Sequence, residues 1–223
     1  MKNCLILTSH LEGSDFLETV KQNHYDAVIC ADGGLQVGER YGLLGDAPVF
    51  LIGDYDSGVR PTDEERAAAR ELILLPCVKD MTDSEAAIDL AVEKGFADLH
   101  VLGGLGGRLD HTLGNLSLLA KYAEDPRVAR IRIEDEQNLV FLKTPGTFRV
   151  PAEGPENRFH YFGLIAWGGP VEGLSITGAK YPLEDHLLTP DTTLGVSNEV
   201  AEGAPFAEVT HTKGQLLVVF SKD

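Results

Sequence analysis

Hydrophobic positions between Met1 and Asp135 alternate between short apolar runs and longer stretches in which apolar residues recur at helical spacing. The short runs predict strands, and the amphipathic stretches between them predict helices. We expect strands at Asn3–Thr8, Ala27–Cys30, Val49–Ile52, Leu72–Leu75, Leu99–Leu102 and Ala129–Ile133. We expect helices at about Asp15–Gln22, Leu35–Tyr41, Thr62–Glu71, Asp83–Lys94 and Thr112–Tyr122. Because nearly continuous apolar strands that alternate with helices form parallel sheets covered on both faces, this part predicts a Rossmann-like α/β fold.

A different pattern begins near Asn138, where helical spacing disappears and Gly or Pro residues separate short runs typical of strands. These runs are Phe159–Trp167, Leu174–Thr177, Thr192–Val196 and Gln215–Ser221. Short strands punctuated in this way predict an all-β, antiparallel sandwich or barrel. We therefore predict two domains, an α/β domain at residues 1–136 and a β-sandwich at residues 137–223. No linker rich in Pro, Gly or Ser separates them, so we expect direct packing.

Composition and charge narrow the classes of function. Hydrophobic residues make up 43% of the chain, which is typical of a globular protein, and the net charge is −16. A field of that sign repels nucleic acids and anionic membranes, so we expect neither as a partner. No apolar run approaches the ~20 residues that cross a bilayer, and the Met1–Thr8 segment is too short for a signal sequence. We therefore expect a cytoplasmic protein.

The three cysteines show no CxxC spacing and have apolar neighbours. Scattered cysteines of this kind are poor material for disulfides or a zinc site. We expect Cys4, Cys30 and Cys77 to be buried free thiols.

Aspartates follow four of the predicted strands: Asp32, Asp54 and Asp56, Asp80 and Asp83, and Asp110. Any one of them alone is as well explained as a helix cap or a turn former. Because the carboxyl ends of parallel strands lie along one edge of the sheet, four such segments in succession predict a cluster of carboxylates there. Clustered carboxylates repel one another unless a cation neutralises them, and oxygen ligands of this kind suit Mg²⁺.

A glycine-rich segment, Gly103–His111, follows the fifth predicted strand. Glycines allow backbone N–H groups to approach phosphate oxygens, Arg108 adds a charged fork, and a helix that begins near Thr112 would direct its positive end to the same place. The segment is neither a Walker A loop nor a GxGxxG fingerprint. It therefore predicts a phosphate site of another kind, with a simple tight turn as the alternative.

Together these segments resemble the thiamine pyrophosphokinase family. The residues that carry the resemblance are Asp32-Gly33-Gly34, Gly53-Asp54-Tyr55-Asp56-Ser57, Lys79-Asp80-Met81-Thr82-Asp83 and Gly103-Gly104-Leu105-Gly106-Gly107-Arg108-Leu109-Asp110-His111, in the same order and spacing across the N-terminal half, with Ser197-Asn198 near the end. The resemblance implies transfer of diphosphate from ATP to the hydroxyl of thiamine, which gives thiamine diphosphate and AMP. It also implies a homodimer whose thiamine site lies between the catalytic domain of one subunit and the β domain of the other.

Residue by residue, the resemblance implies that Asp54, Asp56 and Asp83 hold Mg²⁺ against the ATP phosphates, with Asp32 and Asp110 lining the same crevice. The nucleotide-binding candidates in the loop are Gly104, Gly106, Gly107, Arg108 and His111. His111 could equally orient Asp110 or cap a helix. Ser57 and Thr82 could bind a phosphate or the water around the metal, or serve as helix caps.

For thiamine, the resemblance implies contacts from Ser197 and Asn198 to the pyrimidine end. Tyr181 stands near a position where the family often has Trp, so we expect its ring to stack on thiamine, although it could also be a surface aromatic. Trp167, in an apolar run, is expected in the core.

In the implied reaction the thiamine hydroxyl attacks the β-phosphorus of ATP in line and AMP leaves. Asp56 is our first choice for the proton acceptor and Asp54 the second, with Arg108 and loop N–H groups stabilising charge. Two alternatives remain: a metal-dependent nucleotide phosphohydrolase that uses water, and a non-catalytic module that binds nucleotide or thiamine.

Overall fold

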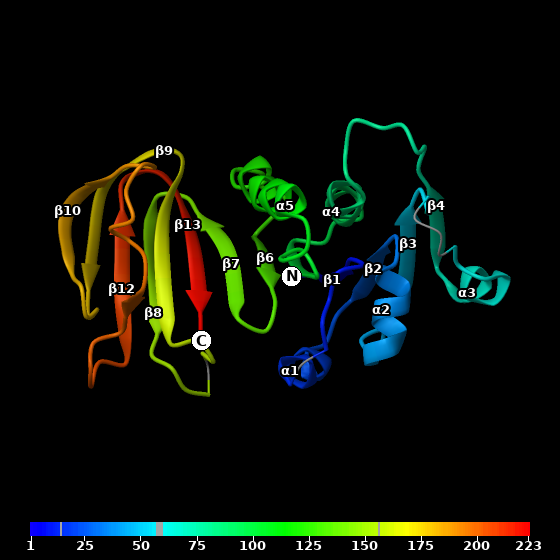
Figure 1. The fold of residues 1–223 in the computed structure, drawn as a ribbon, viewed down its shortest axis with the longest axis horizontal. Helices are drawn as coiled ribbons and strands as arrows, with labels where there is room; N and C mark the ends of the chain where they lie inside the picture. The colour runs from blue at the N-terminus through cyan, green and yellow to red at the C-terminus, as the bar shows by residue number, and fades with distance from the viewer. Residues whose placement is uncertain (14, 57–59, 156) are drawn as a thin grey trace. The chain divides into compact units, whose positions relative to one another are not determined.

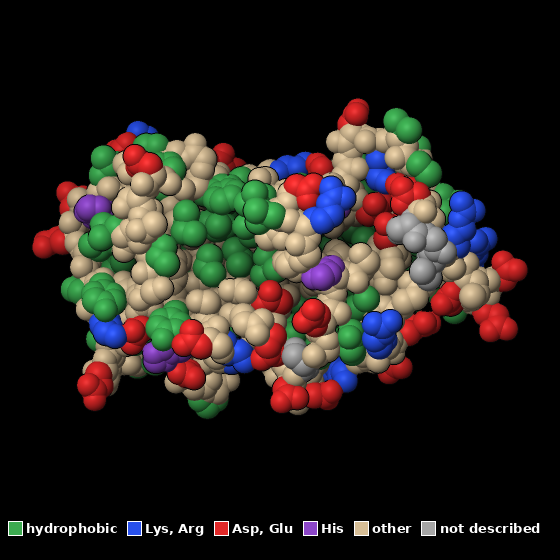
Figure 2. Space-filling model, viewed as in Figure 1, with side chains coloured by type: hydrophobic (Ala, Val, Ile, Leu, Met, Phe, Trp, Pro, Cys, Tyr) green, Lys and Arg blue, Asp and Glu red, His purple; other side chains and the backbone are tan. Residues whose placement is uncertain are grey.

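The computed structural model describes residues 1–13, 15–56, 60–155 and 157–223. The chain divides into two compact units, one of Met1–Leu118 with Asp125–Glu136 and the other of Leu119–Glu124 with Gln137–Asp223. Acidic side chains are spread over the face drawn in Figure 2, as the net charge of −16 leads one to expect. Within the described part of the chain, no helix is both long enough and apolar enough to span a membrane.

The first unit is a parallel sheet with the strand order β4-β3-β2-β1-β5-β6 (Figure 1). Its strands are β1 (Asn3–Leu7), β2 (Ala27–Ala31), β3 (Val49–Gly53), β4 (Glu71–Leu74), β5 (Asp98–Leu102) and β6 (Arg130–Glu134). Its helices are α1 (Phe16–Gln22), α2 (Gly34–Tyr41), α3 (Asp63–Ala68), α4 (Asp83–Glu93) and α5 (Leu109–Lys121). The chain moves outward from β1 to β4 and then returns to the other side of β1 with β5, which makes a topological switch point. The expected parallel α/β fold is confirmed.

Burial of the strands on both faces explains their nearly continuous apolar sequences. Every residue of β2 is buried, and the core includes Leu5 and Leu7 of β1 together with Phe16 of α1 and Leu35 of α2. Helix α4 packs against β1, β2 and β3, on the other face of the sheet from α1 and α2 (Figure 1). The carboxyl ends of the strands are therefore held rigidly along one edge.

The second unit is made of antiparallel strands. They are β7 (Asn138–Lys143), β8 (Gly146–Pro151), β9 (Tyr161–Thr177), β10 (Leu183–Leu188), β11 (Asn198–Glu199), β12 (Phe206–His211) and β13 (Lys213–Ser221). The β-rich second domain is confirmed. Its long central strand, β9, pairs with β13 between Tyr161 and Glu172 and with β12 between Ser175 and Thr177.

The glycines of β9 explain how one strand serves two neighbours. Gly168 and Gly173 have φ of 72° and 67°, in the left-handed region where L side chains are strained. These positions fall within β9, where its pairing passes from β13 to β12 and β10. The expected strands Phe159–Trp167 and Leu174–Thr177 are thus two parts of a single strand.

Several details differ from the sequence-based expectations. The strand expected at Thr192–Val196 is wrong, because this segment forms turns closed by backbone hydrogen bonds such as Val196 N–H to the Thr193 carbonyl at 3.1 Å. The helix expected from Thr112 begins earlier, at Leu109. Cys77 is exposed, whereas Cys4 and Cys30 are buried as expected. Trp167 is only partly buried, so its expected place in the core is wrong.

Candidate functional site

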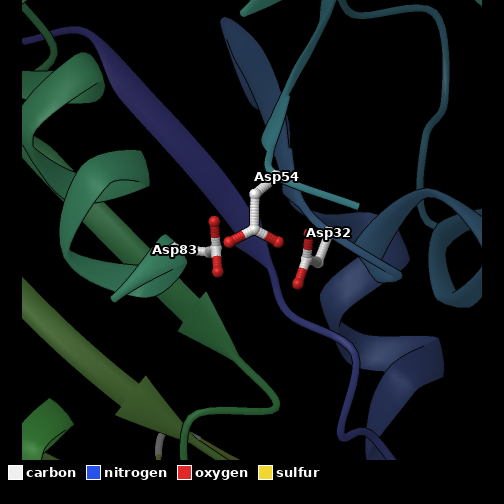
Figure 3. Close-up of side chains that lie close together, drawn as sticks. All are labelled: Asp32, Asp54 and Asp83. Carbon is white, nitrogen blue, oxygen red and sulfur yellow. The ribbon is translucent and has the colours of Figure 1, made fainter. Parts of the chain in front are cut away.

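Three aspartates converge at the carboxyl edge of the parallel sheet. Asp32 follows β2, Asp54 follows β3 and Asp83 is the first residue of α4. One oxygen of each carboxylate lies within 4.8 Å of the others, and Figure 3 shows the three side chains directed toward a common point. Among the described residues, this is the one group of His, Cys, Asp or Glu side chains with the spacing of metal ligands.

Two residues at the site, Asp32 in the cluster and Tyr55 directly after Asp54, have unusual backbone conformations. Asp32 and Tyr55 have φ of 49° and 52°, in the left-handed region that non-glycine residues rarely adopt. The N–H of Asp32 donates to the Ile52 carbonyl at 2.9 Å, and the N–H of Tyr55 donates to Asp32 Oδ1 at 3.2 Å. These bonds join the ends of β2 and β3, and local strain of this kind is often found at functional sites.

Gly53 makes room for the Asp32 carboxylate. A Cβ atom at this position would lie 2.4 Å from Asp32 Oδ1 and 3.1 Å from its backbone nitrogen. Any side chain here would displace Asp32 or the strand end. Gly53 is therefore required because the Asp32 carboxylate lies where a side chain at position 53 would be.

The start of α4 places Asp83. Thr82 is the N-cap of this helix, and its hydroxyl accepts a hydrogen bond from the Glu85 N–H at 3.2 Å. The capping role is thus the one that the structure shows for Thr82. Asp83 follows in the first turn, where the helix dipole stabilises negative charge.

Lys79 neutralises part of the cluster. Its Nζ donates a hydrogen bond to Asp54 Oδ2 and lies 3.2 Å from Asp83 Oδ1. The hydrogen bond from Lys79 lowers the pKa of Asp54 below its usual range. Burial opposes the charge on Lys79, but its bonds to Asp54 and Asp83 outweigh that effect and raise its pKa. Lys79 belongs to the same motif as Asp83, four residues further on, yet its other ion pair reaches Asp54, which is 25 residues away.

Burial is the main reason why the pKa of Asp32 is raised, and repulsion from the carboxylates of Asp83 and Asp54 adds to it. A bound cation would reverse this penalty by neutralising the cluster. Three carboxylates are hard oxygen donors of the kind that Mg²⁺ binds, usually with substrate phosphates and water completing its shell. The residues present therefore fit a divalent cation.

Asp56 lies beside this cluster but is not part of it. Its side chain is exposed, and its N–H donates to Asp54 Oδ1 at 3.2 Å. The structure thus groups Asp32, rather than Asp56, with Asp54 and Asp83. Asp80 is also exposed, and Ser57 lies outside the described residues.

The glycine-rich loop is held by side chains of α5 and by the ring of His10. The buried Asn115 donates from Nδ2 to the Gly104 carbonyl at 2.8 Å, and Thr112 Oγ1 donates to the Gly106 carbonyl at 3.0 Å. The ring of His10, which follows β1, packs against Gly106 and Gly107, both at positive φ. Neither Asn115 nor His10 was expected, because only the folded chain brings them to the loop.

Arg108 and Asp110, at the start of α5, pair with each other. Arg108 Nη2 lies 2.6 Å from Asp110 Oδ2, and its Nε donates to Oδ1 at 3.2 Å. This pairing lowers the pKa of Asp110. The His111 N–H donates to Asp110 Oδ1 at 3.1 Å, and all three side chains are exposed. The guanidinium is thus exposed to solvent and paired with Asp110.

The residues expected to bind thiamine lie together in the second unit. Asn198 is buried, and its amide holds the backbone of Tyr181: Nδ2 donates to the Tyr181 carbonyl at 2.8 Å and Oδ1 accepts from its N–H at 3.0 Å. The ring of Tyr181 is 57% exposed. Ser197 is exposed and has φ of 58°. Asn198 therefore holds the backbone of Tyr181, whose side chain is exposed, with the Lys180 ammonium group 5.6 Å from the centre of its ring.

A cavity of about 500 Å³ lies elsewhere in the first unit. Its lining comes from residues around the start of β2, between Val20 and Val28, and from residues 42–48, which precede β3. This is the amino edge of the sheet, opposite the carboxylates, so the cavity is not part of the site described above.

The fold and the site together define a class of protein: an α/β domain with a carboxylate cluster that suits a divalent cation, followed by a β domain. The family profile of the thiamin pyrophosphokinase catalytic domain matches residues 20–131. The profile of the thiamin pyrophosphokinase vitamin B1 binding domain matches residues 149–216. The chain belongs to the thiamin pyrophosphokinase family, as the resemblance of its motifs implied.

Individual relatives agree with this assignment. A protein of Bacillus subtilis named thiamine pyrophosphokinase is 35% identical over 183 residues, which cover 80% of this chain and 81% of the relative. The crystal structure of thiamine pyrophosphokinase from Bacillus subtilis superposes with a TM-score of 0.82 at 29% identity and covers all of both chains. Thiamin pyrophosphokinase from Candida albicans, at 19% identity, covers all of this chain and 89% of its own and shares the fold with a TM-score of 0.78.

Proposed function

We propose that this protein transfers a diphosphate group from ATP to the hydroxyl of thiamine, which yields thiamine diphosphate and AMP. The observation that carries the proposal is the convergence of Asp32, Asp54 and Asp83 at the carboxyl edge of a parallel sheet. Both domains match the profiles of a family named for this activity. A binding module without turnover would gain nothing from three carboxylates that repel one another.

Asp54, Asp83 and Asp32 would hold Mg²⁺, and the loop from Gly104 to Gly107 would offer backbone N–H groups to the phosphates of ATP. Bound Mg²⁺ supplies charge neutralisation for the polyphosphate. The loop is already fixed by Asn115 and Thr112, so its donors need little reorganisation on binding. Arg108, which is exposed, would add a charged fork at the mouth of the site.

Asp56 is the best placed of the aspartates to accept the proton of the thiamine hydroxyl. Lys79 lowers the pKa of Asp54 and so weakens Asp54 as a base. Asp56 is exposed, and its backbone is tied to Asp54, which keeps it at the rim of the cluster. We therefore retain Asp56 as the base and assign Asp54 to the metal.

Thiamine would stack on the exposed ring of Tyr181, with Ser197 beside it and Asn198 holding the Tyr181 backbone. The proposal includes a cytoplasmic homodimer in which the catalytic unit of one subunit meets the β unit of the other. The support for the dimer is family membership.

The direct test is an assay of AMP and thiamine diphosphate with ATP, Mg²⁺ and thiamine, with EDTA as the control. We expect both products in equal amounts, dependent on thiamine and on the metal. AMP or ADP released without thiamine would indicate a phosphohydrolase instead. Binding of thiamine or ATP without any product would indicate a non-catalytic module.

A further inference from the structure

The ammonium group of Lys79 is paired with two of the three carboxylates in the acidic cluster. It is hydrogen-bonded to Asp54 and lies 3.2 Å from Asp83, and its side chain is only 11% exposed. Lys79 comes from the segment between β4 and α4, so it reaches the cluster from outside the strands that carry Asp32 and Asp54. In the described part of the chain, it is the one cation paired with Asp54 or Asp83.

The charges of the cluster suggest what this arrangement does. Three ionised carboxylates and one ammonium group leave an excess of two negative charges, which one divalent cation would balance. Without Lys79 the excess would be three, in a partly buried place where repulsion is costly. Lys79 therefore reduces the repulsion within the cluster while no metal is bound.

The geometry indicates that Lys79 and a metal would compete. Both oxygens of Asp54 are engaged, Oδ1 by the Asp56 N–H at 3.2 Å and Oδ2 by Lys79. One oxygen of each carboxylate lies within 4.8 Å of the others, a spacing that lets a single Mg²⁺ contact all three. A metal that binds these oxygens would need the Asp54 and Asp83 oxygens that Lys79 now holds, and its charge would repel the ammonium group.

We propose that Lys79 is the resident counter-ion of the acidic cluster: it holds Asp54 and Asp83 together in the metal-free protein and yields their oxygens to a divalent cation. The flexible stem of lysine lets the ammonium group turn away from the carboxylates. It then stands beside the phosphates that accompany the metal and donates hydrogen bonds to their oxygens. The identity of the incoming metal–nucleotide rests on the proposed function, whereas the competition rests on the ion pairs alone.

Calorimetric titration of nucleotide-free protein with Mn²⁺, together with melting in EDTA, tests this inference. The variant Lys79→Gln removes the charge, Lys79→Arg retains it, and Lys21→Gln is a matched control that removes an exposed pair with Glu18. We expect Lys79→Gln to bind Mn²⁺ at least about fivefold more tightly, because a repelled charge has been removed. We expect its Tm in EDTA to fall by about 5 °C and to recover with Mn²⁺, while the other two variants change little.

Equal or weaker Mn²⁺ binding by Lys79→Gln, or an unchanged Tm in EDTA, would overturn the counter-ion role. Absence of Mn²⁺ binding in every variant would overturn both this role and the metal site. A negative result in the AMP assay with the expected calorimetric result would instead overturn the reaction and leave the counter-ion in place.

Discussion

At the scale of single residues, neighbouring carboxylates have different surroundings and therefore different chemistry. Asp54 accepts hydrogen bonds on both oxygens, and its pKa is lowered by Lys79. Asp56, two positions further on, is exposed and outside the cluster. Asp32 is partly buried beside other carboxylates, which raises its pKa. Three aspartates of one motif set can thus divide metal binding and proton transfer between them.

This division predicts the behaviour of Asp56→Asn. We expect kcat to fall by about 100-fold or more because a general base is lost, with little change in KM or in Mn²⁺ affinity. Steady-state kinetics and calorimetric titration check both parts. Asp54→Asn is the matched comparison and should weaken Mn²⁺ binding. Near-normal turnover of Asp56→Asn would remove its role as the base.

A second prediction concerns the buried amide of Asn198. The variant Asn198→Asp keeps the shape but cannot donate to the Tyr181 carbonyl, and it buries a charge. We expect a loss of about 3 kcal/mol in the free energy of unfolding, measured by urea denaturation, and weaker thiamine binding. Asn23→Asp, at an exposed position, should change stability by less than about 0.5 kcal/mol. Unchanged stability of Asn198→Asp would contradict the role of this amide in holding Tyr181.

The sequence predicted the cluster residues Asp32, Asp54 and Asp83 because each immediately follows a strand or begins a helix. It did not predict that Lys79 pairs with Asp54 or that Asn115 bonds to Gly104, since these partners lie 25 and 11 residues away and only packing brings them together. Because Asp32 and Asp56 both follow predicted strands, their positions in the sequence could not show which of the two joins the cluster. That choice depends on the left-handed backbone at Asp32 and Tyr55.

At the scale of the elements, strand ends and helix starts make the site. The apolar strands of the first unit were predictable because burial on both faces leaves a continuous apolar run. Strand β12 was not, because it is only six residues long and one of its buried positions is the polar residue His211, which breaks the apolar pattern. The segment at Thr192–Val196 has residues that favour strands, but Gly195 packs against the backbone of β9, and its Cβ would lie 2.0 Å from the Leu164 carbonyl oxygen. Close backbone contacts of this kind have no signal in the periodicity.

Two glycines allow a test at this scale. Gly53→Ala would place Cβ against Asp32 Oδ1, and we expect Mn²⁺ affinity and activity to fall and stability to drop by about 1–3 kcal/mol. Gly114→Ala, in α5, has open space around Cβ and should stabilise by about 0.5–1 kcal/mol. Thermal melting and Mn²⁺ titration distinguish the pair. If Gly53→Ala bound Mn²⁺ normally, Asp32 would not be a ligand.

At the scale of the whole molecule, the two units carry different parts of the proposed chemistry: the carboxylates lie in the first, and Tyr181 and Asn198 in the second. Alternation of strands and helices followed by Gly- and Pro-punctuated strands was sufficient to predict both fold classes. The number of subunits in the active protein could not be predicted in the same way, because no spacing of residues in one chain specifies it. The proposed dimer therefore needs a test of its own.

Mixing two inactive variants provides that test. Asp54→Asn impairs the first unit and Tyr181→Ala the second, so a hybrid dimer has one intact site only if each site is shared between subunits. With random reassortment, half of the dimers are hybrids and about a quarter of the wild-type activity should return. The mixture is assayed at low thiamine concentration, with each variant alone as the control. No recovery after verified exchange of subunits would place each site within one chain.

The long strand β9 has a consequence for how the second unit is held together. Because β9 pairs with β13 along one part and with β12 and β10 along another, both groups of strands depend on the same backbone. Unfolding of β9 would leave both groups of strands without their central partner. The second unit should therefore open as one cooperative foldon rather than sheet by sheet. The free energy needed to unfold the surface that carries Tyr181 is then that of the entire unit, and not that of the local loop alone.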